Sequence, residues 1–147
     1  MYKWLVCLGV VGIAPLLIGA DSPTDKLADR ELAKLDGKWQ VVSIEHESVK
    51  APDSQTDGNT WIFEKGTLVT RTTDAGEEIN AKVAWKVKFV ASGKRKSLEL
   101  NGDRMIQAIY LLDGDDLVVC GGKELPSDFA TGPDGSGRMM WVLKRVK

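Results

Sequence analysis

Trp39 and Arg145 lie far apart in the chain but have the residue types needed to close a small β-barrel. A Gly-x-Trp motif at 37–39 opens the first predicted strand, and Arg145 ends the last. An indole can fill the bottom of such a barrel while a guanidinium stacks on it and caps nearby carbonyls. We therefore predict a structural contact between Trp39 and Arg145. Arg145 is preferred to Lys144 because it shares a strand face with the apolar residues of the last strand.

The residues that most often perform catalysis are scarce. His46 is the only histidine, and its neighbours Glu45 and Glu47 could raise its pKa or share a metal site with it. One histidine without a nearby cysteine cannot complete a structural zinc site. Cys120 has no local base or cation to depress the pKa of its thiol. We expect a solvated His46, a buried inert Cys120 and no catalytic residue.

The charged clusters also lack the pattern of a specific site. Asp113, Asp115 and Asp116 resemble the start of a calcium loop, but the full ligand spacing is missing, and an Asp-Gly hairpin turn explains them. Lysines and one arginine recur along 82–96, yet the formal net charge of the chain is −1. We therefore predict a solvated face, with no nucleic-acid partner, no metal and no cofactor.

The first 20 residues have the layout of a secretory signal peptide. Lys3 precedes an apolar run, and Ile18-Gly19-Ala20 supplies small residues at a cleavage site. The run is interrupted by Pro15 and is shorter than the roughly 20 residues needed to span a bilayer. We predict cleavage after Ala20, export to the periplasm or the exterior, and no membrane span afterwards. Residues 21–36 then form a lead and a short helix, and 37–147 form one domain.

The remaining pattern is one short helix followed by strands and turns. Thr24 is the predicted N-cap, leucines recur at helical spacing, and Asp36-Gly37 ends a helix of about ten residues. Ile79–Phe89 shows the strict alternation of a half-buried antiparallel strand. The predicted strands are 39–45, 59–64, 67–72, 79–89, 97–100, 105–112, 117–120 and the segment from Met139.

These strands predict an all-β fold: an eight-stranded, antiparallel, up-and-down, lipocalin-like barrel preceded by one short α-helix. Eight strands can close a barrel whose interior is filled by side chains or holds one small ligand. A two-sheet sandwich is the alternative, but it usually needs longer connections between the sheets. Two polar loops, 47–58 and 121–137, interrupt the otherwise short turns.

From Leu35 onward the sequence resembles a family of secreted lipocalin-like domains that are abundant in planctomycete bacteria. The resemblance rests on LDGKWQVVS at 35–43, AIYLLDGDDLVVC at 108–120, PSDF at 126–129 and VLKR at 142–145. It implies export and a lipocalin-like fold, and no biochemical activity is established for the family. The family usually has Arg before the proline where this chain has Leu125, so no role of that arginine is carried over.

The aromatic residues predict where a ligand would bind. Trp61, Phe63, Trp85 and Tyr110 lie on three of the predicted strands at inward positions, and we expect them to line a pocket for a small hydrophobic molecule. The protein would then be a monomeric, non-enzymatic binding domain. Alternatively, these side chains fill the barrel. In that case the polar loops would contact another envelope protein or a surface polymer.

Overall fold

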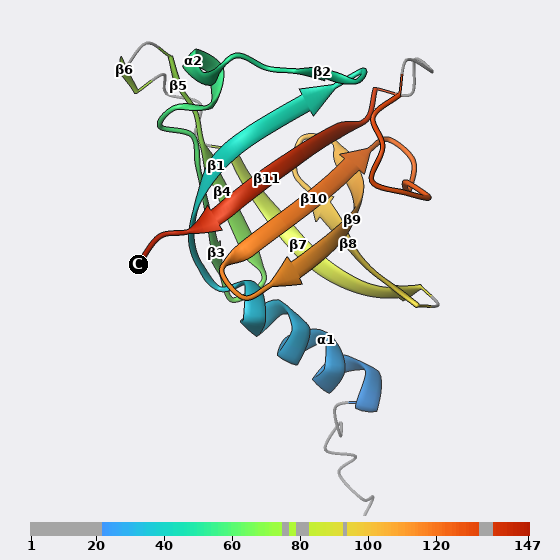
Figure 1. Ribbon diagram of the computed structural model, residues 1–147. Helices are drawn as coiled ribbons and strands as arrows, with labels where there is room; N and C mark the ends of the chain where they lie inside the picture. The colour runs from blue at the N-terminus through green and yellow to red at the C-terminus, as the bar shows by residue number, and fades with distance from the viewer. Residues whose placement is uncertain (1–21, 75–76, 79–82, 93, 133–136) are drawn as a thin grey trace, which may run out of the picture.

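The computed structural model describes residues 22–74, 77–78, 83–92, 94–132 and 137–147 of the 147-residue chain (Figure 1). The predicted signal peptide, 1–20, lies outside these residues, so its cleavage stays a prediction. Eight antiparallel strands close into a barrel preceded by a short helix, which confirms the predicted fold class. The barrel strands are β1 (Gly37–His46), β3 (Thr60–Glu64), β4 (Thr67–Arg71), β7 (Val83–Ser92), β8 (Arg95–Asn101), β9 (Met105–Asp113), β10 (Asp116–Gly122) and β11 (Met139–Arg145).

The barrel closes through its first and last strands. Each barrel strand pairs with the next in the chain, and β1 also pairs with β11. The register of this closing pair places Trp39 opposite Arg145. The pairing shifts between Val41 and Ser43, where an irregularity allows β1 to bend and twist around the barrel. The sheet therefore closes on itself, and the sandwich alternative does not apply.

Helix α1 (Pro23–Leu35) crosses one end of the barrel (Figure 1). Its N-cap is Ser22, so the prediction of Thr24 was wrong. Ser22 and Asp25 form a capping box, and Pro23 occupies the first turn, where its fixed φ suits a helix. These features start the helix earlier and extend it to 13 residues, against the predicted ten or so. We call this end of the barrel the floor.

Four short elements gather near the opposite end, which we call the mouth (Figure 1). The predicted loop 47–58 contains β2 (Val49–Lys50) and the one-turn helix α2 (Asp53–Thr56). The pair β5 (Thr73–Asp74) and β6 (Glu77–Glu78) extends beyond β4. Such short pieces leave no periodic pattern of apolar residues, so the sequence did not predict them.

The alternating strand runs as β7, although the first residues of the predicted segment, 79–82, lie outside the described part of the chain. Val87 is buried, while Trp85 and Phe89 are partly buried on the same side. Lys86 and Lys88 are exposed between them. The period of two thus places apolar side chains inside and lysines outside, as predicted.

The apolar core is concentrated at the floor. The helix contributes Leu35, and the strands contribute side chains that are at most 4% exposed, including Trp39, Phe63, Leu117 and Leu143. Closer to the mouth, Ile44, Trp85, Ile106 and Trp141 are only partly buried against this cluster. The barrel is therefore solid at one end and less densely filled at the other.

Candidate functional site

The floor is held by the predicted contact between Trp39 and Arg145. The Cζ atom of Arg145 lies 4.2 Å from the centroid of the indole. The guanidinium also donates hydrogen bonds to the carbonyl oxygens of Asp36 (2.7 Å) and Lys34 (2.9 Å), at the end of α1. The indole Nε1 donates to the carbonyl of Leu35 at 2.8 Å. The predicted contact between the two residues is therefore present, and hydrogen bonds join both of them to the end of α1.

Gly37 makes this close approach possible. A Cβ atom at this position would lie 2.9 Å from a terminal nitrogen of Arg145, and the φ of Gly37 is +131°. Any other residue would both clash with the guanidinium and strain the backbone. The Gly-x-Trp motif therefore combines the glycine that admits the arginine with the tryptophan that receives it.

A buried ionic cluster ties α1 to the barrel beside this contact. Glu31 is 6% exposed and accepts hydrogen bonds from the ammonium groups of Lys34 and Lys96. The Tyr110 hydroxyl donates to the same carboxylate at 3.5 Å. Hydrogen bonds from Lys34 and then Lys96 hold the pKa of Glu31 below its usual value. Burial, followed by the negative charge of Glu31, raises the pKa of Tyr110.

The acidic turn between β9 and β10 is also part of the floor. Asp115 lies 3.6 Å from Nε of Arg145 and 3.2 Å from Nζ of Lys147, and its carbonyl accepts the backbone N–H of Arg145. Asp116 lies 3.8 Å from Nζ of Lys144. These aspartates therefore face the basic end of the chain. Among the described residues, no group of three or more His, Cys, Asp or Glu side chains could hold a metal ion.

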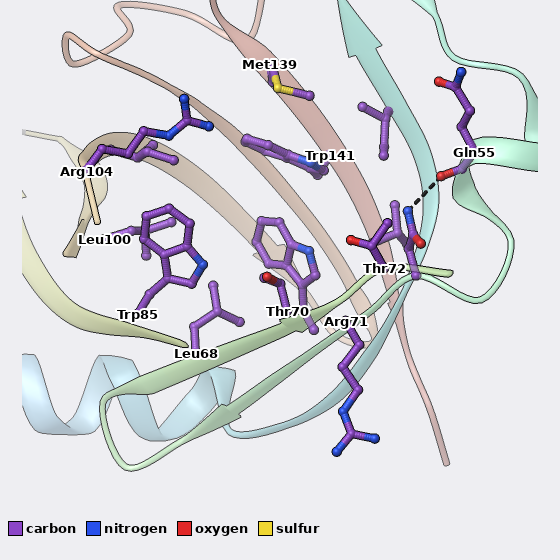
Figure 2. Close-up of a pocket in the computed structure, with 15 residues that line it drawn as sticks. Gln55, Leu68, Thr70, Arg71, Thr72, Trp85, Leu100, Arg104, Met139 and Trp141 are labelled. Carbon is purple, nitrogen blue, oxygen red and sulfur yellow. Dashed lines mark hydrogen bonds between the residues drawn. The ribbon is translucent and has the colours of Figure 1, made fainter. Parts of the chain in front are cut away.

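At the mouth the barrel interior contains a cavity of about 520 Å³ (Figure 2). Several lining residues, including Gln55, Thr72 and Arg104, are exposed, so the cavity opens to solvent on this side. The complete lining is Val41, Ile44, Gln55, Asn59, Trp61, Leu68, Thr70, Arg71, Thr72, Trp85, Leu100, Arg104, Ile106, Met139 and Trp141. The described chain therefore forms an apolar chamber with a polar rim.

Three tryptophans form most of the aromatic surface of the cavity. Trp61 and Trp141 pack against each other, with ring centroids 5.3 Å apart and planes tilted by 54°. Trp85 comes from β7, which lies opposite β11 in the ring of eight strands. Figure 2 shows Trp85 and Trp141 on different sides of the space. A ligand between them would contact aromatic surface on two sides.

The position of Trp85 depends on Gly102 in the turn between β8 and β9. A Cβ atom on Gly102 would lie 2.8 Å from Cε3 of the Trp85 indole. The ring therefore packs directly against the backbone of this turn. The same turn carries Arg104, so the aromatic wall and the rim arginine are positioned together.

The polar groups of the rim differ in how they are bonded. Asn59 Nδ2 donates to the backbone carbonyl of Gln55 at 2.7 Å, which holds α2 beside the mouth (Figure 2). The hydroxyl of Thr70 donates to the carbonyl of Val83 at 3.5 Å. Within the described residues, the guanidinium of Arg104 has no hydrogen bond or ion pair. It is therefore available to a bound molecule.

Two of the four predicted pocket residues line the cavity, and two do not. Trp61 and Trp85 are among its lining residues. The prediction that Phe63 and Tyr110 also line it was wrong. Both point inward, as the alternation indicated, but Phe63 belongs to the tightly packed core and Tyr110 reaches Glu31 at the floor. Strand alternation defines the face of a side chain but not its height along the barrel.

Trp141 and Arg104 also line the cavity, although neither was predicted as a pocket residue. Trp141 lies on the same strand face as Arg145, and this shared face indicated that the Trp141 side chain points inward. Because Trp141 precedes Arg145 by four residues along the strand, its side chain could have been expected to lie farther from the floor. No local signal marked Arg104, because its role depends on how the turn between β8 and β9 lies over the mouth.

Neither His46 nor Cys120 is among the residues that line the cavity. His46 is exposed at the end of β1, where it pairs with Val49 of β2 and Met139 of β11. Cys120 is fully buried, and this burial raises the pKa of its thiol. A raised thiol pKa leaves less of the reactive thiolate at neutral pH.

Comparison with family models, curated proteins and solved structures finds no match for this chain. Membership of the planctomycete family therefore stays a prediction. Within the described residues, no helix has the length and apolar character required to cross a membrane. The geometry of the barrel is consequently the main basis for an account of function.

Proposed function

We propose that this protein is an exported, non-enzymatic binding domain that holds a small apolar molecule in the mouth of its barrel. The observation that carries the proposal is the cavity of about 520 Å³ lined by Trp61, Trp85 and Trp141. Pockets for small molecules usually measure roughly 300–1,000 Å³ and are lined mainly by apolar and aromatic side chains.

The free energy of binding would come mainly from burial of apolar surface. Each Å² of apolar surface removed from water contributes about 25 cal/mol, and the three indoles offer broad faces for such contact. The strands that carry them are held by the closed barrel and by the floor. A preformed cavity avoids much of the entropy cost of ordering the binding residues.

The alternative of a loop-mediated interaction module was based on a barrel filled by side chains. The volume at the mouth favours internal binding over that alternative. Export belongs to the same proposal and rests on the sequence of residues 1–20. An exported domain of the resembled family with a cavity at its mouth would act on molecules of the periplasm or the exterior.

The test uses N-phenyl-1-naphthylamine, a neutral aromatic dye that fluoresces strongly in apolar surroundings. We expect a saturable increase in fluorescence with one site per chain. Two substitutions on β4 place the same bulky side chain on opposite faces of one strand. Thr70→Trp adds an indole within the cavity, and we expect it to lower the dye affinity at least about tenfold.

Val69→Trp is the matched control. Val69 neighbours Thr70 but is absent from the cavity lining, so we expect its variant to bind the dye within about twofold of the wild type. Circular dichroism establishes that both variants are folded. Absence of saturable binding, or equal losses in both variants, would overturn the proposed function.

A further inference from the structure

The rim of the cavity carries a positive charge that no carboxylate of the described lining neutralises. The described lining contains two arginines and no Asp or Glu. Some other exposed basic residues form ion pairs, among them Lys88, Lys96, Lys144 and Lys147. Arg104, by contrast, has no ion pair within the described residues. A described lining with arginines and no carboxylate makes the mouth attractive to anions.

Only one of the two arginines faces the cavity. Figure 2 shows the guanidinium of Arg104 on the side of Met139 and Trp141, above Trp85. The side chain of Arg71 extends away from these residues. Thr70 of β4 and Thr72, just after this strand, lie on either side of Arg71 and also line the cavity, as expected when alternate residues point inward. Arg104 is thus the arginine positioned for a ligand.

We infer that the ligand is an amphipathic organic anion. Its apolar, preferably aromatic, body would lie between Trp85 and the Trp61–Trp141 pair, and its acidic group would contact Arg104 at the rim. This inference rests on the proposed function and adds the chemical class of the ligand. A guanidinium binds carboxylate, sulfonate or phosphate oxygens through paired N–H donors. The anionic group would remain near solvent, so that little of its hydration is lost.

The distribution of charge opposes the other ligand class that tryptophans commonly hold. Indole faces attract quaternary ammonium groups, and sites of that kind bring several rings around the cation. Here Trp61 and Trp141 pack against each other, and Arg104 would repel a cation at the entrance. The described lining contains no carboxylate that would compensate this repulsion. The chemistry of the mouth therefore favours an acid.

Two dyes with one carbon skeleton test the inference. 8-Anilinonaphthalene-1-sulfonate is N-phenyl-1-naphthylamine with an added sulfonate, so the ratio of their dissociation constants isolates the contribution of the negative charge. We expect Arg104→Gln to weaken sulfonate-dye binding about fivefold while changing neutral-dye binding less than about twofold. Raising the salt concentration should weaken the sulfonate dye selectively in the wild type and have little selective effect in Arg104→Gln.

Arg71→Gln is the matched control because it removes the same charge from a rim residue that points away. We expect it to change the ratio less than about twofold. In a separate competition, dodecanoate should displace the neutral dye at lower concentration than dodecyltrimethylammonium. An unchanged ratio in Arg104→Gln, or stronger displacement by the cation, would overturn the anion inference. If the anion inference fails but the neutral dye still binds and Thr70→Trp still weakens that binding, the proposed function stands. If the neutral dye does not bind at all, both the proposed function and the anion inference fail.

Discussion

The two ends of this barrel use the same residue types for opposite purposes. At the floor, Trp39 is fully buried, its indole N–H is bonded, and Arg145 stacks on it. At the mouth, Trp85 and Trp141 remain partly exposed around a cavity, and Arg104 has no partner within the described residues. A tryptophan and an arginine therefore stabilise the fold at one end and remain available at the other.

The comparison shows how a small barrel separates stability from binding. Among the described residues, every buried polar side-chain atom has a hydrogen-bond partner, and at the floor Lys96 donates a hydrogen bond to Glu31 of α1. Polar groups that are hydrogen-bonded to one another have few free donors or acceptors for a ligand. Binding sites instead retain groups whose interactions are incomplete without a ligand, at some cost to stability.

Substituting a tryptophan at each end should give the largest contrast. We expect Trp39→Ala to lower the free energy of unfolding by about 3–5 kcal/mol, because it removes a fully buried indole and its hydrogen bond. Trp85→Ala should cost only about 1–2 kcal/mol, because that ring is partly exposed. Urea denaturation measures both values. Equal losses would contradict the division between floor and mouth.

The arginine of the floor should have the next largest effect. We expect Arg145→Gln to cost about 2 kcal/mol, since it loses both the cation–π contact and charge-assisted bonds to the end of α1. Lys144→Gln is the control, because Lys144 has only an exposed pair with Asp116 at 3.8 Å and should cost less than about 0.5 kcal/mol. Thermal unfolding compares the two variants. A larger loss of stability in Lys144→Gln than in Arg145→Gln would contradict the assignment of the closing contact to Arg145.

The ionic cluster of the floor should make stability depend on acid pH. The pKa of Glu31 is lower in the folded protein than its ordinary value of 4.5. The unfolded chain therefore binds more protons in this range, so stability falls as the pH drops from about 5 through the folded pKa. Urea midpoints measured from pH 6 to pH 3 should show a decrease that is smaller in Glu31→Gln.

The exposed Glu64→Gln serves as the comparison for that series. It removes a carboxylate from the surface of β3 and leaves the floor intact. We expect its pH profile to follow the wild type. An identical profile in Glu31→Gln would show that the buried cluster does not provide the acid dependence.

The smallest effect on stability, with a selective effect on binding, should come from Gly102. Its added Cβ would lie 2.8 Å from the Trp85 ring, so Gly102→Ala should displace the indole into the cavity. We expect neutral-dye affinity to fall about three- to fivefold while the unfolding midpoint changes little. Gly132→Ala, where a Cβ would meet nothing within 4 Å, should leave both unchanged. Normal affinity in Gly102→Ala would show that the Trp85 position is not critical.

Much of the fold followed from local patterns. Alternation predicted the strands, short Gly- and Asp-containing turns predicted their antiparallel order, and Trp39 with Arg145 predicted the closure. The helix was also predicted, but its start was misplaced because Thr24 offered a plausible cap inside a longer helix. Ser22 with Asp25 completes the two-way capping box that determines the observed start.

The amino-acid sequence by itself determined that this chain forms a barrel, because side-chain alternation and turn chemistry are local properties. Only the tertiary structure decided which inward side chains meet the cavity. Phe63 and Tyr110 lie inward at the level where the core and α1 fill the barrel, whereas Trp85 and Trp141 lie higher. That level depends on the stagger of eight strands and on the helix beneath them, which are non-local properties.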